Sequence, residues 1–149
     1  MLRTRLVSIA FCLGFLAALH AQNPAALASQ KLKAFVANRD AAKAKAFYGD
    51  TLGLRLIGQD PGALVFDANG TRLRVQIVPE VAVGKYTALG WEVTDIVATV
   101  KALKKSGVKL EMIQGIKQDE LGIWTAHDGT RVAWFKDPDG NILSVDQKP

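Results

Sequence analysis

The same order of predicted elements occurs twice along this chain, and that repeat constrains the fold more than any other feature. In each copy a strand candidate precedes an amphipathic helix, and further strand candidates follow, over about 50 to 60 residues in all. One copy cannot close a sheet by itself. Two copies are therefore expected to lie side by side and share a core.

The first copy is predicted to span residues 32–80. Either Asn38 or Asp40 can cap its helix, and Gly53 ends it in the usual C-terminal position. Apolar residues recur at helical spacing along this helix, at Ala44, Phe47, Tyr48 and Leu52. Strands are predicted at Lys33–Val36, Leu54–Gly58, Ala63–Asp67 and Thr71–Val78, the last two joined by the hairpin signal Asn69-Gly70.

The second copy is predicted to span residues 87–147. Thr94 or Asp95 caps its helix, Gly107 ends it, and its buried stripe comprises Ile96, Val97, Val100 and Leu103. Strands are predicted at Ala88–Val93, Val108–Ile113, Thr130–Lys136 and Ile142–Gln147, with Ile123–His127 as an additional candidate that leaves the count open by one. A tight turn is predicted after Lys136, with Gly140 and Asn141 at positive φ.

These patterns predict an α+β fold of two tandem βαβββ modules. The two modules are expected to form a curved mixed sheet, or trough, with the helices on its outer face. One strand face then meets a helix, and the other face lines a cavity.

The N-terminus has the layout of a secretory signal peptide. Arg3 and Arg5 precede an apolar run that is too short for a comfortable membrane span. We predict a signal peptide over 1–21, a spacer over 22–31 and one domain over 32–147, with export to the periplasm or the extracellular space. An uncleaved anchor is the rival interpretation, and cleavage after Ala21 or after Ala28 remains open.

Removal of that segment also removes the one cysteine, Cys12, so no disulfide or thiolate site is expected in the mature protein. Without Arg3 and Arg5 the formal net charge falls from +5 to +3. Such a mild charge, with lysines scattered over helices and loops, does not indicate nucleic-acid binding. No membrane partner is expected after cleavage.

Three segments, in the order Ala44–Leu54, Gly90–Val93 and Val132–Asn141, resemble the vicinal oxygen chelate superfamily, also called glyoxalase/bleomycin-resistance/dioxygenase. The resemblance covers about residues 32–147 and implies a homodimer. It also implies a divalent ion in the trough, held by His, Glu or Gln from the first strand of each module and by Glu, Gln or His from the last.

The positions that match those ligand places hold poor metal ligands. They are Lys33 and then Arg74 or Gln76 in the first module, and a position near Ala88 and then Ser144 in the second. The charged side chains of lysine and arginine donate hydrogen bonds and have no lone pair for a metal, and alanine has no side-chain atom that could coordinate one. We therefore expect no metal cofactor, because protein-held divalent ions need three or more good ligands.

Alternation along the strands instead suggests a mixed polar lining for a small polar or anionic organic molecule. The residues predicted to bind it are Lys33, Arg74, Gln76, Glu92, Trp124 and Ser144. An equally weighted alternative is that Glu92 forms a structural ion pair with Lys33 or Arg74. His127 is expected in an exposed turn, and it becomes a candidate base if residues 114–128 fold over the trough.

Three hypotheses about function follow. The preferred one is an exported, metal-free binder of a small ligand; no catalytic residue is assigned. The second is a metal-dependent lyase, isomerase or dioxygenase that uses ligands such as Gln76, Glu92, His127 or Asp146. The third is a structural or interaction module with a filled trough. No motif for a serine nucleophile or a phosphate-binding loop is present.

Overall fold

A computed structural model describes residues 27–149, and the chain divides after Gln30 into two units. The first unit contributes one short 3-10 turn, η1 (Leu27–Ser29). The second unit, Lys31–Pro149, holds all the other described elements. The predicted signal peptide, with Cys12 and His20, lies outside the described residues. Among the described helices, none is long and apolar enough to cross a membrane.

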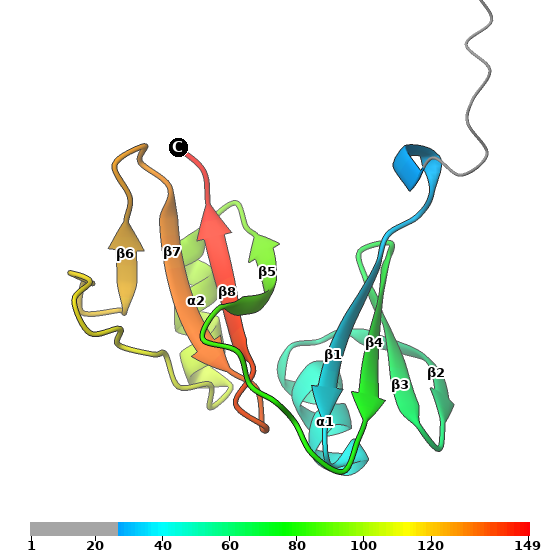
Figure 1. Cartoon of the computed structure of the whole chain (residues 1–149). Coiled ribbons are helices and arrows are strands. Elements are labelled where there is room, and N and C mark those ends of the chain that lie inside the picture. Colours follow the sequence, from blue (N-terminus) through cyan, green and yellow to red (C-terminus); the bar gives the residue numbers. More distant parts are fainter. Residues whose placement is uncertain (1–26) are drawn as a thin grey trace, which may run out of the picture. The chain divides into compact units, whose positions relative to one another are not determined.

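The first module forms a four-stranded sheet, here sheet A, with strand order β1-β4-β3-β2 (Figure 1). Strands β1 and β4 are parallel, and the other neighbours are antiparallel. Its elements are β1 (Lys33–Asn38), α1 (Ala41–Lys45), η2 (Ala46–Thr51), β2 (Arg55–Asp60), β3 (Ala63–Ala68) and β4 (Thr71–Ile77).

The helix of this module begins and ends where the sequence predicts. The carboxylate of Asp40 caps α1 by accepting hydrogen bonds from the N–H groups of Ala42 and Lys43, at 2.9 and 3.0 Å. The helix continues as the wider π-helical turn η2, and Gly53 follows it at φ +74°. Asn38, the other predicted cap, is fully buried, and its side chain donates a hydrogen bond to Asp137 instead of capping the helix.

The second module repeats this plan in sheet B, with strand order β5-β8-β7-β6. Asp95 caps its helix by accepting a hydrogen bond from the N–H of Ala98, at 2.9 Å. Its elements are β5 (Thr87–Glu92), α2 (Ile96–Lys105), β6 (Ile123–Thr125), β7 (Arg131–Lys136) and β8 (Ile142–Gln147). Two mixed four-stranded sheets with one helical segment each confirm the predicted α+β fold of tandem βαβββ modules.

The strand predicted at Val108–Ile113 is wrong. Only Leu110 bridges Phe135 of β7, and the N–H of Glu111 donates to the carbonyl of Trp134 at 2.7 Å. The chain then leaves the sheet and returns to β7 as β6. The additional candidate, Ile123–His127, forms a strand over Ile123–Thr125.

The side chain of Gln118 explains why the edge strand is interrupted. Its oxygen accepts a hydrogen bond from the N–H of Ile113 at 2.7 Å. Its amide donates to the carbonyls of Glu111 and Gly122, at 3.0 and 2.6 Å. This one side chain thus satisfies backbone groups that a continuous strand would have paired.

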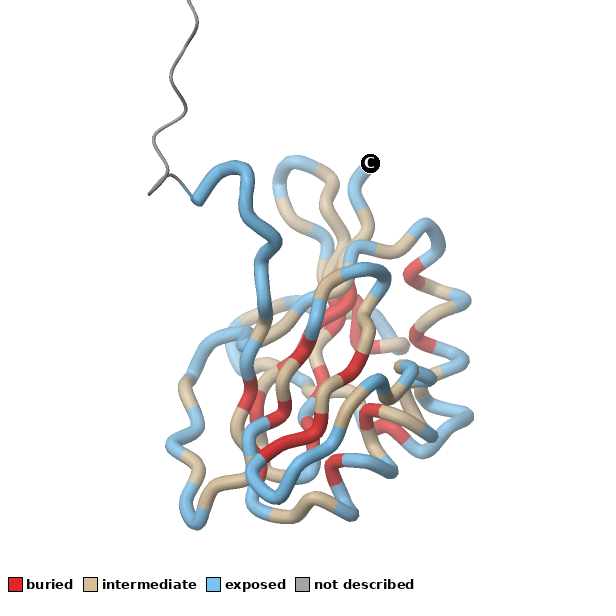
Figure 2. Tube along the Cα trace, turned by 90° about the vertical axis from the view of Figure 1, so that its right-hand side faces the viewer, coloured by how far each residue is buried: buried red, intermediate tan, exposed pale blue. Residues whose placement is uncertain are grey.

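One hydrophobic core contains residues of both modules. Along β1, β4 and β7, buried positions alternate with more exposed ones (Figure 2). The ring of Phe47 in η2 lies edge-on to Tyr48, with centroids 5.2 Å apart, and 6.5 Å from the ring of Phe135 in β7. The helical segment of the first module therefore packs against the sheet of the second.

The turn between β7 and β8 adds a polar connection between the modules, centred on the buried carboxylate of Asp137. Its Oδ2 accepts hydrogen bonds from the side chains of Asn38, Tyr48 and Asn141, at 2.7, 2.8 and 2.8 Å. Its Oδ1 accepts from the N–H groups of Asp139 and Asn141, at 3.0 and 2.9 Å. We call these four side chains, Asn38, Tyr48, Asp137 and Asn141, the interlock.

The prediction that Asn141 has a positive φ is wrong. In this turn only Gly140 does, at +91°, and Asn69 is the one described non-glycine residue with positive φ. Asn141 stabilises the turn through its side chain instead, because its amide donates hydrogen bonds to Asp137 and, at 2.8 Å, to the carbonyl of Ala37.

Burial and the neighbouring Asp137 raise the pKa of Tyr48 far above its usual range, so its hydroxyl stays protonated and donates to Asp137.

Asp139, in the same turn, makes a second link to the first module. Its carboxylate accepts hydrogen bonds from the backbone N–H of Arg39, at 2.9 Å, and from the guanidinium of Arg39. Burial opposes ionisation of this carboxyl, but the donors and the charge of Arg39 outweigh it and hold the pKa of Asp139 below its usual range.

Stability should therefore depend on pH through Asp139. A lowered folded-state pKa gives stability that is present above the unfolded pKa, about 3.9, and is lost as pH falls through the folded value. Urea unfolding should show Asp139→Asn less stable than the parent chain at pH 6, with a smaller difference at pH 3. A difference of equal size at both pH values would contradict this assignment.

Candidate functional site

Each sheet has a face that points away from the hydrophobic core, which we call its open face. In β4, Leu73 and Val75 are buried, whereas Arg72, Arg74 and Gln76 alternate with them on the open face. The strand register places Lys33 of β1 beside Arg72, and Phe35 beside Arg74. Three predicted site residues, Lys33, Arg74 and Gln76, thus share the open face of sheet A.

Cations outnumber carboxylates on this face. Arg74 pairs with Asp60 at 3.2 Å, and Arg55 on the edge strand β2 pairs with Asp67 at 2.7 Å. Asp60 has a lowered pKa, chiefly through the N–H of Gly62 and further through Arg74. Within residues 27–149, neither Lys33 nor Arg72 takes part in an ion pair.

Lys33 and Arg72 line a common cavity of about 260 Å³. Lys31, Leu32 and Gly70 complete its lining, so three cationic residues and no acidic one surround it. Such a cavity suits an anionic group. Arg72 was not among the predicted site residues, although its alternation with Arg74 places it on the same face.

The other three predicted residues lie on the open face of sheet B. Ser144 is paired in register with Gly90 and Trp134, and Glu92 with Asp146. A Cβ at Gly90 would lie 2.9 Å from the Oγ of Ser144, so the glycine leaves room for the serine side chain. Ser144 is only 6% exposed.

Trp124 lies in β6, within the additional strand candidate Ile123–His127. Its ring is 6.0 Å from that of Trp134, at an interplanar angle of 32°. The indole N–H of Trp134 donates to the hydroxyl of Thr87 at 3.2 Å. The two tryptophans form an apolar surface on the open face of sheet B.

The alternative in which Glu92 pairs with Lys33 or Arg74 is wrong, because both Glu92 and Arg74 have other partners. Glu92 pairs with Lys148 at 2.6 Å. This contact, chiefly as a hydrogen bond, raises the pKa of Lys148. The predicted residues therefore form two groups of three, one on each sheet.

A larger cavity, of about 410 Å³, lies against the open face of sheet B. Trp134, Lys136 and Ile142 contribute from the strands. The segment between the modules contributes Val83, Gly84 and Lys85, and the interrupted edge contributes Glu111, Met112 and Ile113. Sequence reasoning missed this cavity because it predicted a continuous edge strand at Val108–Ile113 and did not include Trp134 among the site residues.

The donor set does not fit a divalent metal. The strand positions concerned hold Lys33, Arg74 or Gln76, Ala88 and Ser144, and among the residues described no three His, Cys, Asp or Glu side chains gather around a common point. His127, the remaining candidate, lies exposed in the turn between β6 and β7, as predicted.

Comparison with known proteins gives one family and many similar structures. The model described as Glyoxalase/Bleomycin resistance protein/Dioxygenase superfamily matches residues 31–145. No curated protein sequence matches.

Three of the similar structures illustrate the range. A putative glyoxalase family protein from Bacillus anthracis is 18% identical, with TM-score 0.63, covering 80% of this chain and 94% of that one. Lactoylglutathione lyase from Agrobacterium tumefaciens is 19% identical, with TM-score 0.60 and coverage of 80% and 93%. The fosfomycin resistance protein FosX from Listeria monocytogenes is 13% identical, with TM-score 0.64 and coverage of 81% and 94%. At these identities the likeness concerns the fold alone.

Proposed function

Because the chain belongs to the glyoxalase/bleomycin resistance protein/dioxygenase superfamily, we propose that it binds a small anionic organic molecule on the open faces of its sheets, without the divalent ion expected from the family. Two proteins of similar fold have names that refer to small organic molecules, lactoylglutathione lyase and the fosfomycin resistance protein. We propose that the present chain likewise binds a small organic molecule.

The excess of cations on the open face of sheet A carries the proposal. Lys33 and Arg72 line one cavity without an acidic partner, and Arg74 follows Arg72 on the same face. The planar guanidinium of Arg74 is half-exposed, and its pairing with Asp60 is a single contact of 3.2 Å. An incoming carboxylate or phosphate can therefore compete for it with two parallel hydrogen bonds.

The other hypotheses have weaker support. For a metal-dependent enzyme, Glu92 and Asp146 are neighbours in register, but two carboxylates are fewer than the three ligands such sites use. For a filled trough, the cavities of about 260 and 410 Å³ leave space against both open faces.

A thermal-shift comparison tests the proposal with succinate, citrate and glycerol 3-phosphate as probes. At least one probe should raise the melting temperature, and EDTA should not change that rise. Arg74→Ala should abolish it and leave the unliganded protein folded, because the side chain is partly exposed and its ion pair is at the surface.

Arg55→Ala is the matched control, since Arg55 is a paired arginine on the far edge strand of the same sheet. It should leave the rise unchanged. An unaltered rise in Arg74→Ala would remove Arg74 from the site, and a rise abolished by EDTA would favour the metal-dependent hypothesis.

We further propose export and homodimer formation. Export rests on the charged and apolar layout of residues 1–21, and N-terminal sequencing of secreted protein tests it. For a homodimer, the support is large apolar side chains at the surface, among them Phe35, which is 53% exposed, and Met112, which is 68% exposed. Light scattering on the purified chain measures the oligomeric state.

A further inference from the structure

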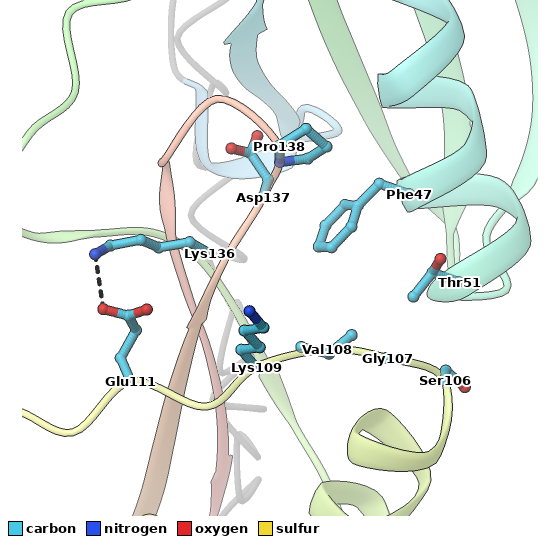
Figure 3. Close-up of a pocket in the computed structure, with 10 residues that line it drawn as sticks. All are labelled: Phe47, Thr51, Ser106, Gly107, Val108, Lys109, Glu111, Lys136, Asp137 and Pro138. Carbon is cyan, nitrogen blue, oxygen red and sulfur yellow. Dashed lines mark hydrogen bonds and ion pairs between the residues drawn. The ribbon is translucent and has the colours of Figure 1, made fainter.

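A cavity of about 360 Å³ lies between η2 and the chain that follows α2 (Figure 3). Phe47 and Thr51 line it from the first module. Val108, Lys109 and Lys136 line it from the second, together with the start of the β7–β8 turn. None of the predicted open-face residues takes part in the lining.

One wall of this cavity is apolar and held in place. Phe47 is half-buried, and its ring orientation is set by contacts with Tyr48 and Phe135. Val108 beside it is buried, with 7% exposure. A flat apolar group can lie against this wall without any rearrangement of the core.

The charged residues around the cavity leave one cation available. The carboxylate of Asp137 already accepts five hydrogen bonds, three from the other side chains of the interlock and two from the backbone N–H groups of Asp139 and Asn141. The carboxylate of Glu111 is paired with Lys136 at 2.7 Å, and in Figure 3 the ammonium group of Lys136 points toward it. Lys109 has no ion-pair partner within residues 27–149, and Figure 3 shows its side chain pointing toward the middle of the lining residues.

We infer that this cavity binds a small organic carboxylate with a flat apolar body, such as an aryl carboxylate. The ammonium group of Lys109 pairs with the carboxylate, and Phe47 and Val108 contact the apolar body. The hydroxyl of Thr51 at the rim is a further donor. A volume of about 360 Å³ lies in the range of small-molecule sites. This site shares no residue with the cationic cavity on sheet A and does not depend on it, although Glu111 and Lys136 also line the cavity of about 410 Å³ against sheet B.

Benzoate is the probe for a test by NMR. Titration of benzoate into the full ¹⁵N-labelled chain should shift the amide signals of Thr51, Gly107 and Lys109. Lys109→Gln should weaken benzoate binding at least fivefold, and benzyl alcohol, which lacks the charge, should bind at least fivefold more weakly than benzoate to the parent chain.

Lys105→Gln is the matched control, because Lys105 is an exposed lysine at the end of α2 that does not line the cavity. It should leave the affinity unchanged, as should Arg74→Ala, which affects only the open-face site. The inference is overturned if the shifts fall on the open faces, if both lysine substitutions weaken binding equally, if Arg74→Ala weakens it, or if benzyl alcohol binds as well as benzoate. Lys109 is exposed, so its substitution does not threaten folding.

Discussion

Replacing Asp137 with alanine is expected to lower the free energy of unfolding by about 4 kcal/mol. The side chain is 5% exposed and accepts five hydrogen bonds, three of them from side chains. Its removal leaves the buried amide of Asn38 and the hydroxyl of Tyr48 without their acceptor, and leaves the amide of Asn141 bonded only to the carbonyl of Ala37. Equilibrium unfolding in urea, followed by tryptophan fluorescence, measures the loss.

Asp128→Ala is the control for this substitution. Asp128 also opens a tight turn between strands, but its carboxylate accepts only local hydrogen bonds, from the N–H and hydroxyl of Thr130 at 2.9 and 3.0 Å. It should change stability little. If the two alanine variants lost the same amount, the interlock would not be the source of the effect.

Phe135→Ala is expected to cost about 3 to 5 kcal/mol, the range for a large aromatic side chain removed from a core. Phe135 is 1% exposed, and its ring lies 6.5 Å from that of Phe47 in the other module. The substitution removes packing within sheet B and between the modules together. The same urea measurement gives its size.

Phe35→Ala makes the same chemical change at a position that is 53% exposed, on the open face of sheet A. It should cost less than about 1 kcal/mol in the isolated chain. A loss equal to that of Phe135→Ala would mean that a second copy of the chain covers Phe35, and the loss would then depend on protein concentration.

Local signals were enough to predict the repeated plan of the fold. Asp40 and Asp95 cap the two helices as expected, since a cap depends on residues two or three positions away. Alternation along β4 placed Arg74 and Gln76 on one face for the same reason: the period of two is a property of the strand itself.

Features that depend on particular side-chain contacts could not be predicted in this way. The turn at Asp137 was identified as a turn, but its bonds to Asn38 and Tyr48 join residues 99 and 89 positions apart. The break in the edge strand depends on where the side chain of Gln118 reaches once the loop has formed. The bonds of Asp137 span most of the chain, and those of Gln118, although short in sequence, follow no repeating pattern, so the cavities beside them were also missed.

The interlock and the shared core have a consequence for the segment between the modules. Within the described chain, residues 79–86 form no hydrogen bond, whereas Asp137, Asp139 and Asn141 all bond to the first module. The two modules therefore resemble the subunits of a dimer joined by a tether. Covalent continuity contributes mainly an effective concentration, which keeps the halves associated at any dilution, while their affinity comes from the turn and the core.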